Sequence, residues 1–171
     1  MRGAAVLALV VFGGCVATAR AEVAPPVMKS ATEMAQLETP LPTPYDDRAD
    51  ADAALAATIA KAKADGKRVL IDLGGNWCTD CRILAAVMEL PELKAFVAKH
   101  YDVVEIDVGR MNRNLQIPAK YGVTKLDGVP TVLIVEPNGK LLNATNAADL
   151  ADARSMNPQG IANWLARWAK P

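Results

Sequence analysis

The sequence has 171 residues, of which 51% are hydrophobic, enough for one domain with a buried core and some additional segments. Nineteen basic residues balance nineteen acidic ones, so the overall charge provides no electrostatic basis for binding nucleic acid.

The first 21 residues have the features of a secretory signal peptide. Arg2 provides a positive start, residues 4–11 form a short apolar core, and Ala19-Arg20-Ala21 places small residues at the cleavage positions. The apolar run is too short and too interrupted by glycines to predict a membrane span. We therefore expect export to the periplasm, with Glu22 as the first residue of the mature protein.

Cys15 allows a second interpretation of the export signal. Phe12-Gly13-Gly14-Cys15 loosely resembles a lipoprotein processing site, at which Cys15 would be acylated. Phe12 fits that site poorly, so lipid anchoring stands as the alternative to a soluble product. Either way Cys15 is lost as a thiol, and the two cysteines that remain are too few for a disulfide framework. With His100 as the one histidine, they also cannot complete a tetrahedral zinc site, and we expect no metal and no cofactor.

Residues 22–45 differ in composition from the rest of the chain. They contain five prolines and few large apolar side chains, which predicts a flexible linker. The folded domain is accordingly expected at residues 46–171.

The sequence of residues 46–171 predicts alternating helices and strands. Residues 46–65 have helical spacing and end at Gly66, and the apolar run 69–73 is typical of a strand covered on both faces. Helical periodicity then extends from Cys78 to His100, with a break at Pro91. Strands are expected at 102–108 and 131–135, a short helix ends near 121–122, and a hairpin turn at 137–140 leads into a returning strand at 141–142. An amphipathic helix over 158–170 completes the chain.

Trp77-Cys78-Thr79-Asp80-Cys81 stands between the first strand and the helix after it. On the first turn of a helix, this spacing lets two sulfurs close a strained ring, and the helix dipole favours a thiolate. Such a pair can exchange electrons with the cysteines of other proteins.

This arrangement, together with Gly128-Val129-Pro130-Thr131 before the hairpin, resembles the thioredoxin-like superfamily of the thiol:disulfide interchange type over residues 46–168. The resemblance implies an α/β thioredoxin-like fold with a central mixed sheet of about four strands flanked by helices. It also implies a redox-active disulfide between Cys78, which attacks the substrate, and Cys81, which resolves the mixed disulfide.

The resemblance assigns further roles around the thiols. Pro130 is expected to follow a cis peptide bond and to face the cysteines, where it would bind an extended substrate together with Val129 and Trp77. Trp77 has an alternative interpretation as an ordinary core residue, and Pro130 as an ordinary residue at the start of a strand.

Asp72 lies inside the apolar strand six residues before Cys78, where the family has a buried acid that accepts a proton from the resolving cysteine. Burial would raise its pKa toward the range of a general base. Val103 stands where thioredoxins have a lysine that pairs with this acid, so such a restraint on the pKa is not expected. The alternative is an aspartate at the strand end that bonds to solvent.

The residues between the cysteines bear on the direction of electron flow. Thioredoxins carry Gly-Pro there, whereas this chain carries Thr79-Asp80. The charge of Asp80 is expected to disfavour a thiolate at Cys78, while Arg82 and the helix dipole act in the opposite sense. We expect a reducing couple, because strong oxidants in this superfamily have unusually stabilised thiolates.

The sequence thus predicts an exported disulfide reductase that acts on protein disulfide and thiol substrates as a monomer, without nucleic acid. A membrane-bound thiol reductant would recharge it, since the periplasm lacks a soluble thiol buffer. Two alternatives belong to other classes of function. One is a Cu(I)-binding protein that uses the paired thiolates, and the other is a non-catalytic interaction module with a thioredoxin fold.

Overall fold

The computed structural model describes residues 22–171, so the predicted signal peptide lies outside the described residues. Its centre is a three-stranded sheet in the order β2-β1-β3. Strands β1 (Arg68–Gly74) and β2 (Tyr101–Asp107) are parallel, and β3 (Thr131–Val135) is antiparallel to β1. The predicted α/β architecture with a mixed sheet is confirmed.

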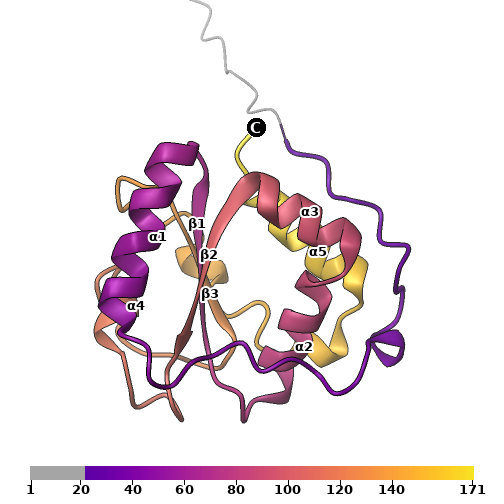
Figure 1. Cartoon of the computed structure of the whole chain (residues 1–171), viewed down its shortest axis with the longest axis horizontal. Coiled ribbons are helices and arrows are strands. Elements are labelled where there is room, and N and C mark those ends of the chain that lie inside the picture. Colours follow the sequence, from indigo (N-terminus) through magenta and orange to yellow (C-terminus); the bar gives the residue numbers. More distant parts are fainter. Residues whose placement is uncertain (1–21) are drawn as a thin grey trace, which may run out of the picture.

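Helices cover both faces of the sheet. The helices are α1 (Ala51–Asp65), α2 (Thr79–Met88), α3 (Pro91–His100), α4 (Gln116–Ala119) and α5 (Pro158–Arg167). Figure 1 shows α1 and α4 on one side of the sheet and α2, α3 and α5 on the other. None of the helices within residues 22–171 is long and apolar enough to cross a membrane.

Local signals set the ends of these helices. The Asp50 side chain accepts the Ala53 amide at the start of α1, and Gly66 ends that helix in the left-handed conformation. Pro91 occupies the first turn of α3, where its missing amide hydrogen costs no helical bond. The break expected at Pro91 is therefore the start of a separate helix.

Strand β1 joins two hydrophobic clusters, because successive side chains of a strand point to opposite faces. All seven of its residues are buried. Leu70 packs in the cluster formed with α2, α3 and α5, whereas Ile71 and Leu73 pack in the cluster that contains α1. The strand that precedes the cysteines is thus held from both sides.

The expected fourth strand is reduced to an isolated bridge between Val135 and Leu141. Along the rest of this edge, the fully buried Asn143 side chain shares the bonding of β3 with the backbone of the returning chain. Its Nδ2 donates to the Val132 carbonyl at 2.7 Å, and its Oδ1 accepts the Ile134 amide at 2.8 Å. The Leu142 amide donates to the Ile134 carbonyl at 2.9 Å, and the Val132 amide donates to the Ala147 carbonyl at 2.8 Å. A side chain therefore satisfies part of the edge of β3 where a regular strand would be expected.

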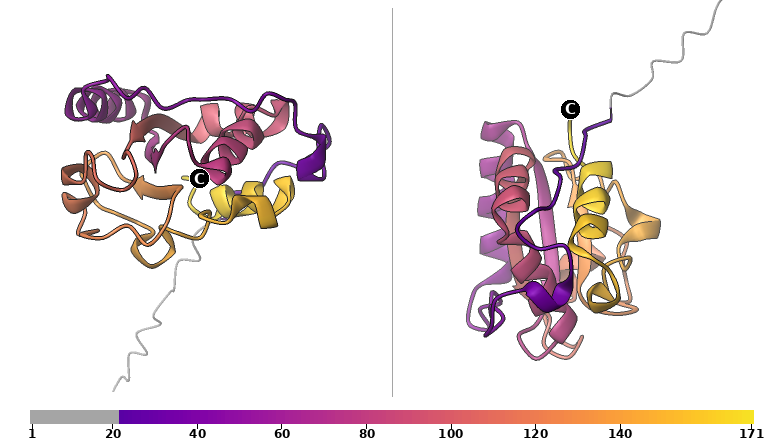
Figure 2. Two further views of the ribbon diagram at one scale, coloured as in Figure 1. Left: turned by 90° about the horizontal axis from the view of Figure 1, so that it is seen from below. Right: turned by 90° about the vertical axis from the view of Figure 1, so that its right-hand side faces the viewer.

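The expectation of a flexible linker at residues 22–45 is wrong in this structure. Met28, Ala31 and Leu37 are buried in the cluster with α2, α3 and α5, and the Met28 amide donates to Gln159. In Figures 1 and 2 this indigo segment follows the outside of the helical layer and then passes α2 to reach α1. Several apolar side chains of the segment are placed where they reach the domain, a property that the proline content does not report.

Candidate dithiol active site

Cys78 forms the N-cap of α2. Strand β1 ends at Gly74, and the turn after it is closed by a bond from the Cys78 amide to the Gly75 carbonyl, 3.0 Å long. The Cys78 Sγ accepts the Cys81 amide at 3.2 Å. A sulfur in the N-cap position receives the positive end of the helix dipole, which favours negative charge on it.

Cys81 lies one turn further and has no exposed surface, whereas Cys78 retains 6% exposure. Burial raises the pKa of the Cys81 thiol far above its usual range, and the neighbouring Cys78 and the charge of Asp72 raise it further. Cys81 therefore needs a nearby base before it can act as a nucleophile.

The loop before β3 lies against the outer thiol. The Val129–Pro130 peptide bond is cis, as predicted. The Cys78 Sγ lies 3.4 Å from the Val129 carbonyl oxygen, to which its S–H donates. The structure thus brings together the two sequence motifs, which are 51 residues apart.

A hollow of about 520 Å³ opens beside Cys78. Trp77 and Val129 contribute to its walls, together with Gly128 and residues between Ala148 and Arg154. Trp77 is 44% exposed, and its indole Nε1 donates to the Gly109 carbonyl at 2.7 Å. The Arg110 guanidinium stacks over the same ring at 4.6 Å. Trp77 is therefore fixed at the groove and does not belong to the core; its contact with a substrate stays a prediction.

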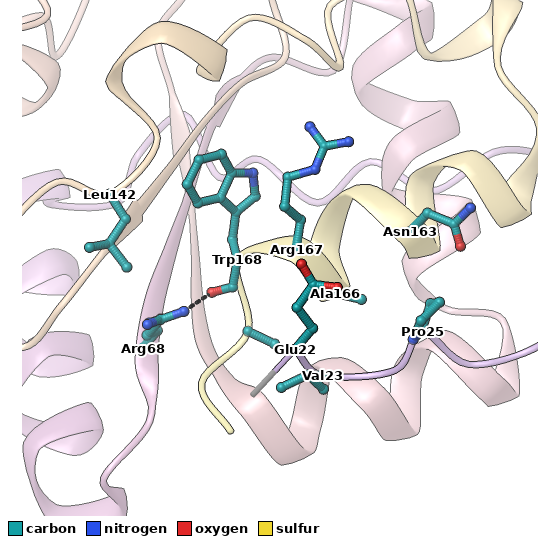
Figure 3. A pocket seen from close by; sticks show the side chains of 10 residues that line it. Glu22, Val23, Pro25, Arg68, Leu142, Asn163, Ala166, Arg167 and Trp168 are labelled. Carbon is teal, nitrogen blue, oxygen red and sulfur yellow. Dashed lines mark hydrogen bonds between the residues drawn. The ribbon is translucent and has the colours of Figure 1, made fainter. Parts of the chain in front are cut away.

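Figure 3 shows a second hollow of about 410 Å³, between the start of the described chain and α5. Glu22, Val23 and Pro25 form one wall, and Arg68 donates to the Trp168 carbonyl within it. Neither cysteine lines this hollow, so the dithiol chemistry belongs to the groove beside Cys78.

Asp72 is fully buried in β1, with Glu105 of β2 and Val132 of β3 as its strand neighbours. This excludes the alternative of an aspartate that bonds to solvent. The pKa of Asp72 is raised to about 7. Burial is the main cause, the charge of Glu105 adds to the rise, and the hydrogen bond from Tyr45 acts in the opposite direction. A carboxyl group with a pKa near neutrality can both take and release a proton. Its role as the proton acceptor stays a prediction.

Tyr45 is a residue of the site that the sequence did not reveal. Its hydroxyl donates to Asp72 Oδ2 at 2.8 Å, and it belongs to the segment interpreted as a linker. Two hydrogen bonds connect its backbone with the Asn76 side chain, at 3.1 and 2.7 Å. The one available signal was a single large aromatic residue at the end of a proline-rich stretch.

Arg154 is a second such residue, and it changes the electrostatic interpretation of Asp80. Its Nε donates to both carboxylate oxygens of Asp80 at 2.9 and 3.0 Å, and its backbone amide donates at 2.9 Å. Burial by itself would raise the pKa of Asp80, but these bonds and the positive charge of Arg154 lower it overall. The negative charge expected to act on Cys78 is therefore paired. Arg82, expected to favour the thiolate, instead donates to the Leu41 and Pro42 carbonyls and holds the N-terminal segment.

Two thiols at the start of a helix, a cis-proline loop against the outer one and a buried acid behind the inner one define a dithiol protein with a thioredoxin fold. A family model described as thioredoxin-like matches residues 50–137. A solved structure, the disulphide isomerase from Xylella fastidiosa Temecula1, is 41% identical over 74% of this chain and 96% of that chain, with a TM-score of 0.69. A thioredoxin from Rickettsia bellii (strain RML369-C) is 31% identical over 72 residues, which are 42% of this chain and 60% of that relative, so the match spans three-fifths of the relative's length. The chain belongs to the thioredoxin-like family, and its relatives support disulfide oxidoreductase activity in general.

Proposed function

We propose that this protein is an exported thiol–disulfide oxidoreductase that reduces disulfides of other periplasmic proteins. The observation that carries the proposal is the asymmetry of the two thiols. Cys78 caps a helix and lines an open groove, while Cys81 lies completely buried behind it. One thiol is placed to meet a client and the other only to meet Cys78.

The reaction proceeds in two displacements. The Cys78 thiolate attacks one sulfur of a client disulfide, the client S–S bond breaks, and one client thiolate leaves with the electron pair. Cys81 then loses its proton and attacks the Cys78 sulfur, and the second client thiolate leaves. The client gains two electrons and the protein ends with a Cys78–Cys81 disulfide.

The groove and the cis-proline loop form the proposed client-binding surface. An extended chain would lie along Val129 and Pro130, with Trp77 at its side. The 3.4 Å distance from the Cys78 sulfur to the Val129 carbonyl supports this assignment, because a chain paired with this loop would bring its disulfide to that sulfur.

We propose the reducing direction because strong oxidants of this kind have an unusually stabilised outer thiolate. Within the described residues, the Cys78 Sγ accepts one hydrogen bond, from the Cys81 amide. The charge of Asp80 contributes little to the direction, because Arg154 pairs with it. A reductase needs an electron source, and we propose a membrane-bound thiol reductant, since the periplasm has no soluble thiol buffer.

Disulfide isomerisation is the second candidate, favoured by the similarity to the disulphide isomerase from Xylella fastidiosa. An isomerase uses the same attack by the outer cysteine, but a client thiol then resolves the mixed disulfide. Reductase activity requires both cysteines, whereas isomerase activity would survive the loss of Cys81.

Insulin reduction with an added reductant tests the function. The wild-type protein should reduce insulin, and Cys78→Ser and Cys81→Ser should both abolish turnover. Refolding of a scrambled disulfide protein distinguishes isomerisation, which would persist in Cys81→Ser. Stoichiometric Cu(I) binding without reductase activity would replace the proposal with metal binding.

Client capture and processing test the cellular part. Cys81→Ser should retain clients as mixed disulfides on Cys78 in the periplasmic fraction, and an empty trap there would contradict the role. The mature protein should begin at Glu22; a lipid on Cys15 would instead show a membrane anchor.

A further inference from the structure

We propose that Tyr45 is a catalytic residue of the resolving step, and that its hydroxyl carries the proton of Cys81 to Asp72. This inference rests on the proposed function, because it concerns the second displacement of the same reaction.

The position of the Tyr45 hydroxyl carries the argument. It donates to Asp72 Oδ2 at 2.8 Å. A side chain at Gly74 would place its Cβ 2.5 Å from this oxygen and 2.9 Å from the Cys81 Sγ, so both atoms occupy the space beside that glycine. With its own hydrogen directed at Asp72, the oxygen keeps lone pairs that can accept the S–H of Cys81.

Hydrogen bonds from the turn before α2 and from α2 itself hold Tyr45 in this position. Asn76 belongs to the turn that carries Cys78, and its side chain bonds both the amide and the carbonyl of Tyr45. Arg82, on the helix of the two thiols, binds the carbonyls of Leu41 and Pro42 just before it. Tyr45 as a whole residue is 2% exposed. The N-terminal segment is thus a part of the active site.

The proton transfer leaves atoms and charges balanced. The S–H proton of Cys81 passes to the Tyr45 oxygen while the phenolic proton passes to Asp72 Oδ2. The Cys81 sulfur forms its bond with the Cys78 sulfur, and the bond from Cys78 to the client breaks with departure of the client thiolate. Tyr45 is neutral before and after the step, and Asp72 holds the proton until it returns to solvent.

The electrostatic surroundings keep the Tyr45 hydroxyl neutral, so it can pass a proton on but cannot remain as a phenolate. Burial and the charge of Asp72 raise the pKa of Tyr45 far above its usual range, so a free phenolate does not form. The groups that face Asp72 are Tyr45 from the N-terminal segment, Cys81 from α2 and Glu105 from β2, while β3 presents Val132.

The two displacements can be timed separately with 2,2′-dithiodipyridine. In the reduced full chain with Cys15→Ser, the first equivalent of thiopyridone reports attack by Cys78 and the second reports resolution by Cys81. Tyr45→Phe keeps the ring but removes the hydroxyl. The first phase should stay within about twofold of the parent, and the second should slow on the order of 10²-fold, as for loss of a general acid–base group.

A double-mutant comparison separates proton transfer from a structural role. Asp72→Asn should slow the second phase, and adding Tyr45→Phe should slow it no further, because both variants interrupt one path. Tyr121→Phe is the matched control, a partly buried tyrosine that does not line the hollow beside Cys78, and should change neither phase.

Three outcomes would overturn the inference. They are a second phase in Tyr45→Phe within twofold of the parent, multiplicative effects in the double variant, or an unchanged second phase in Asp72→Asn. The last of these decides the matter even if Tyr45→Phe does not fold. Insulin reduction by the wild-type protein would remain in each case, so the proposed function would stand without the relay.

Discussion

Replacing Asp72 with asparagine should stabilise the protein at neutral and alkaline pH. The buried carboxyl has a pKa of about 7 in the folded protein, against an ordinary value of 3.8. This difference corresponds to about 4 kcal/mol of folding free energy that the ionised carboxylate costs. Asparagine keeps an oxygen that can accept from Tyr45 but has no charge to bury.

Proton binding sets the sign of the effect. Between a pH of about 4 and about 7 the folded state binds more protons at Asp72 than the unfolded state does, so wild-type stability falls as the pH rises through this window. Asp72→Asn should therefore exceed the wild type by less than about 1 kcal/mol at pH 4 and by about 4 kcal/mol at pH 8.

Urea unfolding of both proteins in the reduced state, across this pH range, measures the difference. Subtracting the two curves removes the contribution of His100, whose pKa is lowered by burial, whereas the contribution of Glu105 stays in the difference because its charge acts on Asp72. Asp127→Asn on the exposed loop is the matched control and should change stability by less than about 0.5 kcal/mol at every pH. A difference between wild type and Asp72→Asn that does not grow with pH would refute the buried, ionisable carboxyl.

Three further predictions concern packing around the site, each measured by urea unfolding. Arg154→Gln leaves the nearly buried carboxylate of Asp80 without its cation and should lower the urea concentration at the midpoint of unfolding; an unchanged midpoint would mean that the pair is absent in solution. Gly74→Ala forces a Cβ against the tyrosine hydroxyl and the inner thiol and should cost about 1–3 kcal/mol, whereas Gly160→Ala, with contacts of 3.4 and 3.5 Å, should be neutral or stabilising. Equal effects at the two glycines would contradict the close packing. Asn143→Ala removes two bonds to β3 and should cost about 2–4 kcal/mol, and an unchanged stability would show that the edge of β3 does not depend on this side chain.

Periodic and local patterns were the parts of the fold that could be predicted. The three strands lie within one residue of the expected ranges because runs of buried apolar residues identify them. The break at Pro91 and the end at Gly66 result from backbone chemistry that neighbouring residues do not alter. No local feature of the sequence predicted that the returning strand would be reduced to a bridge. Two of the bonds to β3 come from the buried side chain of Asn143, and strand propensity does not report such bonds.

The cysteine pair and the proline loop could be found in the sequence because each is a contiguous motif with its own chemistry. Cys78 and Cys81 are found from their immediate neighbours alone, whereas the cis bond at Pro130 was expected from the resemblance to the thioredoxin-like superfamily. Asp72 could be found because a carboxyl group inside an apolar strand is unusual, whatever its partners are.

Tertiary structure alone decided which charges and hydroxyls surround the thiols. Arg154 reaches Asp80 across 74 residues, and Tyr45 reaches Asp72 across 27. The spacing of residues in a sequence determines which groups share one helix turn or one strand face. The Arg154–Asp80 and Tyr45–Asp72 pairs instead join segments that are far apart in the sequence, so they form only where those segments pack together. The sequence by itself therefore determined the fold and the cysteine pair, and packing determined which hydroxyl, carboxyl and cationic groups surround that pair.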